Sequence, residues 1–180
     1  MIQELVDSID KRIAKHISNM HTVIPAVIDK FNEETCTVAV IPKAQYRMPD
    51  GTTTDYPKIN NVPLVYPHSG TITIAFPVKK GDNCLLVFDE KSLDYWRYNR
   101  DTGKELSFDL TDAIAIPSMN PLPDSIVRLA AKEHAVIVKT EGVTLKISDD
   151  GVTISGSVAV EGSMTLNGEP VATITEETQG

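Results

Sequence analysis

The sequence is poor in the residues that build most catalytic and metal sites. It has two cysteines, one tryptophan and four histidines among its 180 residues. Neither His-x-His nor HExxH occurs, and there is no GxGxxG, P-loop or GxSxG pattern. These absences argue against a metalloenzyme, a nucleotide-binding enzyme and a serine hydrolase. We therefore expect no enzymatic activity, no catalytic residue, no metal site and no cofactor.

Cysteine usage and hydropathy exclude further classes. Cys36 and Cys84 lie in separate apolar, strand-like runs without a CxxC partner, so a redox or zinc motif is absent. We interpret both as buried free thiols, and a disulfide between them stays open. No apolar run approaches the ~18 residues of a membrane helix. The charged N-terminal stretch does not resemble a signal peptide, which predicts a protein that is not integral to a membrane and is assembled in a cytoplasm.

The first segment, residues 1–21, has the pattern of an amphipathic helix. A heptad runs through Ile2, Val6, Ile9, Ile13 and then His16 and Met20, in steps of four and three. β-Branched residues at both seam positions favour a three-stranded coiled coil over a two-stranded one. A helix packed on its own domain is the alternative.

Residues 22–120 are expected to form an all-β domain. Segments 22–31 and 35–46 alternate apolar and polar residues around a polar turn, which predicts a hairpin. Further strands are expected at 71–78, 83–90 and 112–117, after a proline-rich irregular stretch. The polar segment that follows Ser92 is interpreted as a surface loop or a short helical turn. Short strands with one long connection are typical of a Greek-key barrel of the OB type.

Residues 121–133, with Pro121 and Pro123, are interpreted as a linker. Residues 134–180 then show short alternating segments separated by glycines, followed by a polar tail. This region has no aromatic residue and no long apolar run, so one copy cannot bury its own apolar stripe. We therefore expect several copies wound together around a core of apolar side chains. The expected core residues are Val136, Val138, Val143, Leu145, Ile147, Val152, Ile154, Val158, Val160, Met164 and Leu166.

Two runs carry a resemblance to a known family. PVKKGDNCLLVFDEKSLDYW at 77–96, followed by DAIAIPSMNP at 112–121, resembles the signature of phage baseplate spike proteins. These are the baseplate assembly protein V and membrane-puncturing spike proteins of contractile tails and related injection systems. The residues that match the signature are Pro77, Gly81, Asp82, Leu86, Phe88, Ser92, Asp94, Asp112, Ala113 and Pro117.

The resemblance implies a mainly β fold: an N-terminal helix, an OB-fold-like Greek-key barrel, then an intertwined triple-stranded β-helix in a homotrimer. It implies a virion protein of the tail baseplate, attached to a tail hub protein by its OB domain. On contraction its needle punctures the host cell envelope. Many relatives hold iron at the tip through His-x-His. This chain has no histidine after His134, so no iron is expected, and Val171 and Ile174 or a separate capping protein would close the tip.

Two alternatives belong to other functional classes. The aromatic run from Tyr95 to Tyr98 and the pair Lys79-Lys80 suit an OB-fold module that binds a glycan or single-stranded nucleic acid. A formal net charge of -8 disfavours nucleic acid as a partner. A tail-associated hydrolase is the other alternative, but the 121–133 linker leaves no room for an inserted catalytic domain.

Overall fold

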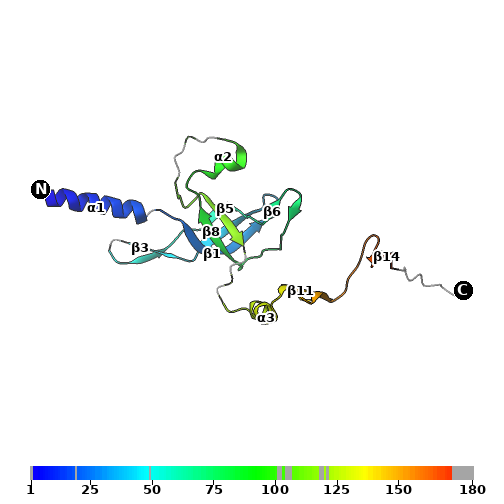
Figure 1. The fold of residues 1–180 in the computed structure, drawn as a ribbon. Coiled ribbons are helices and arrows are strands. Elements are labelled where there is room, and N and C mark those ends of the chain that lie inside the picture. Colours follow the sequence, from blue (N-terminus) through cyan, green and yellow to red (C-terminus); the bar gives the residue numbers. More distant parts are fainter. Residues whose placement is uncertain are drawn as a thin grey trace. The chain divides into compact units, whose positions relative to one another are not determined.

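The computed structural model describes residues 2–18, 20–48, 50–100, 103, 107–117, 120 and 122–171. The chain divides into two compact units, Met1–Pro121 and Leu122–Gly180. The expectation of a mainly β chain with an N-terminal helix is confirmed (Figure 1). Of the polar tail expected after Pro170, only Val171 is described, and its side chain is exposed; the tip residue Ile174 lies outside the described residues.

Helix α1 (Ile2–Ser18) forms the start of the first unit. Its acidic residue Glu4 lies in the first turn and Lys15 in the last, which complements the partial charges of the helix ends. All of its apolar residues, from Ile2 to Ile17, are exposed. The structure therefore does not show the alternative in which this helix buries its stripe on its own domain.

A five-stranded antiparallel sheet follows α1, in the order β5-β2-β1-β8-β9. Its strands are β1 (Val23–Asn32), β2 (Thr37–Pro42), β5 (Ile59–Pro63), β8 (Asn83–Phe88) and β9 (Ala113–Pro117). Strands β1 and β2 form the hairpin expected from the sequence.

The sheet curls into a half-barrel. Register shifts occur between Ile28 and Lys30 on β1 and between Val38 and Val40 on β2, and such bulges bend strands. At the two edges, Leu64 and Ala115 form an isolated parallel bridge, and the Val65 amide donates to the Ala115 carbonyl at 2.9 Å. The concave side holds the hydrophobic core, which comprises Ile24, Ala26, Ile28, Val38, Val40, Ile59, Val62, Cys84, Leu86, Phe88, Ala113 and Ala115.

Counted along the chain, the third strand of this sheet is β5, which the sequence pattern does not predict. We expected a strand over 71–78, but only β7 (Ile72–Thr73) forms there, and it pairs with β6 (His68–Ser69) outside the main sheet. Strand β5, inside the stretch expected to be irregular, pairs with β2 instead. Because Ile59 and Val62 are its only buried residues, β5 has too weak an alternation to be recognised locally.

The first unit also contains a short helix and a short hairpin outside the main sheet. Helix α2 (Leu93–Tyr98) is the helical turn that was one of the two expectations for the segment after Ser92. Strands β3 (Gln45–Arg47) and β4 (Thr53–Asp55) form a short separate hairpin. Cys36 has a φ of 50° and is exposed, in contrast to the buried thiol that we expected; Cys84 is fully buried, and both thiols are free. Cys36 lies in the β1–β2 turn, where the chain reverses outside the core.

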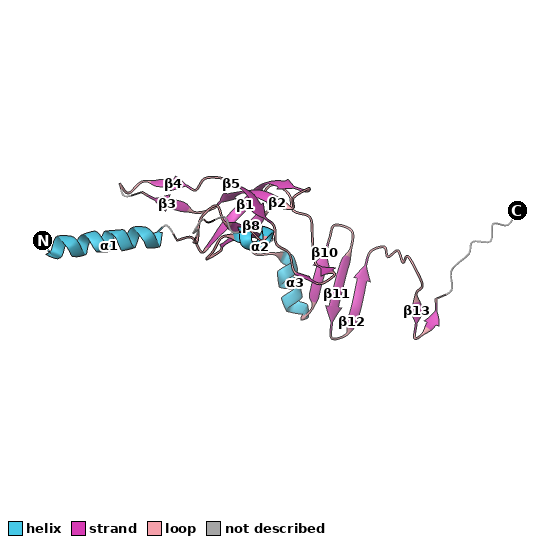
Figure 2. Cartoon of the chain, turned by 90° about the horizontal axis from the view of Figure 1, so that it is seen from above, coloured by secondary structure: helices cyan, strands magenta, loops and turns pink. Residues whose placement is uncertain are grey.

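The second unit begins with helix α3 (Ser125–Glu133), in the segment that was interpreted as a linker. The Asp124 side chain caps it by accepting from the Ile126 amide at 2.6 Å. Three antiparallel strands follow in the order β10-β11-β12, lying side by side in Figure 2: β10 (Val136–Lys139), β11 (Thr144–Ser148) and β12 (Gly151–Ser155). A last short hairpin joins β13 (Thr165–Leu166) and β14 (Glu169–Pro170).

Candidate functional site

The β10-β11-β12 sheet has one continuous apolar face. Directly opposite residues on neighbouring antiparallel strands lie on the same face, as do residues two apart on one strand. The register places Val136 opposite Ile147 and Ile147 opposite Val152. In the next row, Val138 lies opposite Leu145, and Leu145 lies opposite Ile154. Six of the eleven expected core residues therefore share one face.

The opposite face of this sheet is mostly polar. Lys146 pairs with Ile137 on one side and Thr153 on the other. The Lys146 ammonium forms an ion pair with Glu133 of α3 at 2.9 Å. The two faces thus differ in polarity as they do in a sheet that covers a hydrophobic core.

The apolar face is nevertheless uncovered within one chain. Val136 and Val152 are 63% and 65% exposed, and only Leu145 among the six is half-buried. The remaining expected core residues are exposed as well: Val143, Val158, Val160, Met164 and Leu166. Soluble chains rarely expose a contiguous apolar surface of this kind unless a partner covers it.

The signature residues of the first unit mainly build its fold. Leu86, Phe88, Ala113 and Pro117 are buried on β8 and β9. Their place in the half-barrel explains the run of apolar residues in both signature segments. Pro77, by contrast, is exposed in the segment that leads to β8.

Gly81 and Asp82 connect the turn before β8 to the bulge of β1. The Gly81 amide donates to the Ile28 carbonyl, and the Ile28 amide donates to the Asp82 carbonyl, both at 2.8 Å. Gly81 has a φ of 97°, which favours glycine. The Asp82 carboxylate accepts from the Lys79 amide at 2.8 Å and closes the turn.

The Asp29 carboxylate, beside this turn, forms ion pairs with two lysines. Hydrogen bonds from Lys58 and from Lys80 lower the pKa of Asp29 from 3.8 to about 2. The Lys80 ammonium lies 2.8 Å from its carboxylate. The lysine pair that looked like a possible nucleic-acid contact is thus partly engaged in holding the bulge.

Ser92 and Asp112 together cap helix α2. The Asp94 amide donates to the Ser92 hydroxyl at 3.3 Å, and the Leu93 amide donates to the Asp112 carboxylate at 3.0 Å. Because Leu93 is buried, the cap anchors the helix against the half-barrel.

The anchored helix presents an exposed aromatic patch, formed by Tyr95, Trp96 and Tyr98. Trp96 is 68% exposed, and the Arg97 guanidinium lies 4.9 Å from the centre of the Tyr98 ring. Aromatic residues and arginine supply most of the binding energy in many protein interfaces. Sequence inspection had found these residues but not their exposure.

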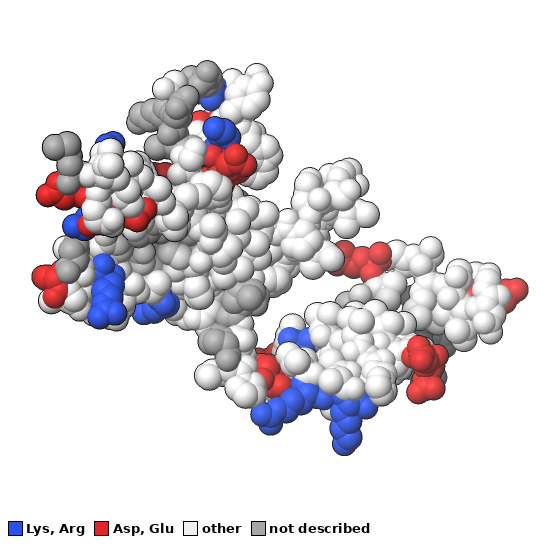
Figure 3. Space-filling view, turned by 60° about the vertical axis from the view of Figure 1, so that its left-hand side comes forward, with Lys and Arg blue, Asp and Glu red and all other residues white. Residues whose placement is uncertain are grey.

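The convex side of the half-barrel is apolar too, which sequence inspection missed. Val23 pairs with Val87, and Val87 with Ile114; Pro25 pairs with Leu85 in the next row on the same face. These side chains point away from the core and are exposed or half-buried. Figure 3 shows that charged side chains leave wide uncharged areas on the visible face of the molecule. Both faces of β1, β8 and β9 are therefore apolar, a pattern typical of sheets that are covered on both sides.

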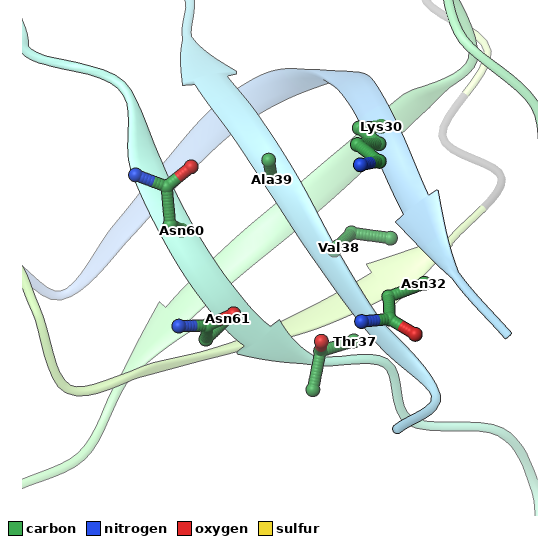
Figure 4. A pocket seen from close by; sticks show the side chains of 7 residues that line it. All are labelled: Lys30, Asn32, Thr37, Val38, Ala39, Asn60 and Asn61. Atoms are coloured by element: carbon green, nitrogen blue, oxygen red, sulfur yellow. The ribbon is translucent and has the colours of Figure 1, made fainter. Parts of the chain in front are cut away.

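A polar hollow of about 420 Å³ lies over β1, β2 and β5 (Figure 4). Its polar lining comprises Lys30, Asn32, Thr37, Asn60 and Asn61. The Asn32 side chain already accepts from the Glu34 amide at 3.1 Å. Among the residues that the structure describes, no aromatic side chain lines the hollow, and the residues of the aromatic patch are not part of it.

The described residues do not form a metal site or a membrane-spanning helix. Within the described residues, no three His, Cys, Asp or Glu side chains gather as a metal site would require. The helices of that same part of the chain are not long and apolar enough to cross a membrane.

Comparison with known proteins supports the resemblance at the level of a phage protein family. The family model described as "Phage protein Gp138 N-terminal domain" matches residues 24–118. The match starts in β1, ends just after β9 and covers more than half of the chain. No curated protein matches the chain. The chain therefore belongs to the family of the phage protein Gp138 N-terminal domain.

Proposed function

We propose that this protein is the central spike of a phage or phage-like contractile tail. In this proposal three chains assemble, their OB-type collars attach to the tail hub, and their second units form the needle that punctures the host envelope. The protein acts by shape and stiffness and is not an enzyme.

The observation that carries the proposal is the uncovered apolar face of β10, β11 and β12. Three copies of such a face, turned toward a common axis, form a dry three-sided core. Full burial of a Val, Leu or Ile side chain contributes about 1.5–3 kcal/mol before the cost of ordering the chains. Val152 and its partner Ile147 would then lie at one level of the axis, and their neighbours Val138, Leu145 and Ile154 at the next.

The first unit suits the collar of such a spike. Five antiparallel strands, with a parallel bridge between the first and last in sheet order, match the strand arrangement of an OB barrel. The signature residues Gly81, Asp82 and Asp112 support this frame through their turn and cap bonds. A collar that transmits force from the hub to the needle must be rigid.

For the hub contact we propose the aromatic patch of Tyr95, Trp96 and Tyr98. These side chains are exposed on a helix that two caps and the buried Leu93 hold in place. Preorganised aromatic side chains bind a protein partner with little loss of conformational entropy. Substituting Trp96 by Ala should release the hub protein without changing the number of chains in the spike.

Sedimentation velocity of the full chain at micromolar concentration tests the proposal. We expect a trimer for the natural sequence. Val152→Asp places three carboxylates at one level of the dry core and should give monomers or a trimer of much lower thermal stability. Thr153→Asp is the matched control, because Thr153 lies on the opposite face, beside Lys146. A monomeric natural chain, or equal stability of the two variants, would overturn the proposal.

The glycan or nucleic-acid alternative makes a different prediction. Such a module would bind a glycan panel or an oligonucleotide panel at moderate salt, and substitution of Lys30 or Asn60 in the polar hollow, or of Trp96, would weaken that binding. Binding by a chain that sediments as a monomer would favour this alternative. Degradation of cell walls by the purified chain would favour the hydrolase instead.

A further inference from the structure

The uncovered stripe of α1 has the spacing of an interhelical seam. Its residues Ile2, Val6, Ile9 and Ile13 follow one another in steps of four, three and four along a continuous helix. They are 83%, 43%, 47% and 51% exposed. Leu5 widens the stripe beside them and is exposed too. With Leu5 and Ile17 included, six exposed large apolar residues lie on one face of α1, and such a face calls for a partner.

The charges of α1 argue against a membrane surface as that partner. The helix carries Glu4, Asp7 and Asp10 against Lys11, Arg12 and Lys15, so its acidic and basic residues are equal in number. Helices that lie on anionic membranes carry an excess of Lys and Arg on their polar face. In α1 the acidic residues come first and the basic ones last, an order that the helix dipole explains.

The seam residues favour copies of the same helix. Val6 and Ile13 occupy one seam position of the heptad, and Ile2 and Ile9 occupy the other. Isoleucine at both positions favours three or four strands over two. His16 takes the next seam position, and one polar residue in a seam specifies register and strand number at some cost in stability.

We infer that the α1 helices of three chains form a parallel coiled coil that brings the chains together and sets their register. Its strand number and parallel direction rest on the proposed three-chain spike, whose needle segments run side by side. The needle needs such a device because its glycine-separated segments are short and irregularly spaced. Joining the chains at α1 raises the effective concentration of the needle segments for one another.

Disulfide trapping in the full chain tests this inference. In a Cys36→Ser background, the buried Cys84 is the only natural thiol, and one new cysteine is added. Val6→Cys lies in the seam, and Ser8→Cys, two residues along, lies on the outer face of α1. In a parallel coiled coil the three Val6 positions meet at one level, so oxidation should link chains about tenfold faster through residue 6 than through residue 8. An antiparallel pair would separate the Val6 positions.

Equal linking through the two positions would overturn the coiled coil. Sedimentation of the same reduced variants separates this failure from that of the proposed function. A trimer without preferential linking at residue 6 leaves the needle proposal standing and removes the coiled coil. A monomer removes both.

A second test uses a variant that should raise stability, so its outcome does not depend on a chain that fails to fold. His16→Ile replaces the polar seam residue and should raise the temperature at which the helical circular dichroism signal is lost. Lys15→Ile is the control, because it adds the same side chain outside the seam. An equal shift for both variants would contradict the seam assignment.

Discussion

The backbone of Gly156 lies against that of Gly142, on the loop between β10 and β11. A Cβ atom on Gly156 would sit 2.7 Å from the Gly142 carbonyl oxygen and 3.0 Å from a methyl carbon of Val143. Gly156 also has a φ of 132°. The glycine just after β12 is thus required both by its conformation and by the space around it.

Gly156→Ala should therefore destabilise the second unit more than Gly162→Ala does. Gly162 has nearly the same φ, 131°, but open space around its Cβ position, so the two variants share the backbone strain and differ in the clash. Thermal unfolding of the two full-length variants measures the difference. Equal unfolding temperatures for the two variants would mean that the loops move apart without a loss of folding free energy.

The Asp29 ion pairs predict a specific pH dependence. The folded state holds the pKa of Asp29 at about 2, below its ordinary 3.8, so these contacts stabilise the fold above about pH 4. Their contribution is lost as the pH falls from about 4 toward 2. Asp29→Asn should lower the unfolding temperature at pH 7, and its difference from the natural chain should shrink toward pH 2. For Glu34→Gln, on the exposed β1–β2 turn, we expect no such convergence.

The two thiols should differ sharply in reactivity. Cys36 is exposed, whereas Cys84 is fully buried and desolvation raises its pKa to about 11. Because the thiolate is the reactive form, an aromatic disulfide reagent should modify one thiol per native chain and two in denaturant. In Cys36→Ser the native chain should show no fast reaction. Fast modification of that variant would contradict the burial of Cys84.

Two substitutions of Asp112 distinguish the contribution of its charge to the α2 cap from that of its hydrogen bond. Asp112→Ala removes the acceptor of the Leu93 amide and should cost about 1 kcal/mol of folding free energy. Asp112→Asn keeps an oxygen at that place and should cost less. Denaturant unfolding of the two variants gives the comparison, and an equal loss for both would show that the carboxylate acts through its charge.

Much of the fold follows from local patterns. The four-three spacing of Ile2, Val6 and Ile9 determines the face of α1, because each residue turns by a fixed angle along a helix. The alternation of Val136 and Val138, and of Leu145 and Ile147, likewise determines which side chains of a strand share a side. The signature from Pro77 to Pro117 was sufficient to indicate a phage protein, although it resembled the baseplate spike proteins and not specifically the Gp138 family.

The sequence alone thus determined the amphipathic helix, the alternating strands and the assignment to a phage protein. Only the tertiary structure decided that β5 and not the 71–78 segment joins the main sheet, that Cys36 is exposed, and that Val136, Ile147 and Val152 align across three strands. The physical reason is that periodicity depends on side-chain directions within one segment. Pairing and register depend on which distant segments close the sheet, and this information is not local.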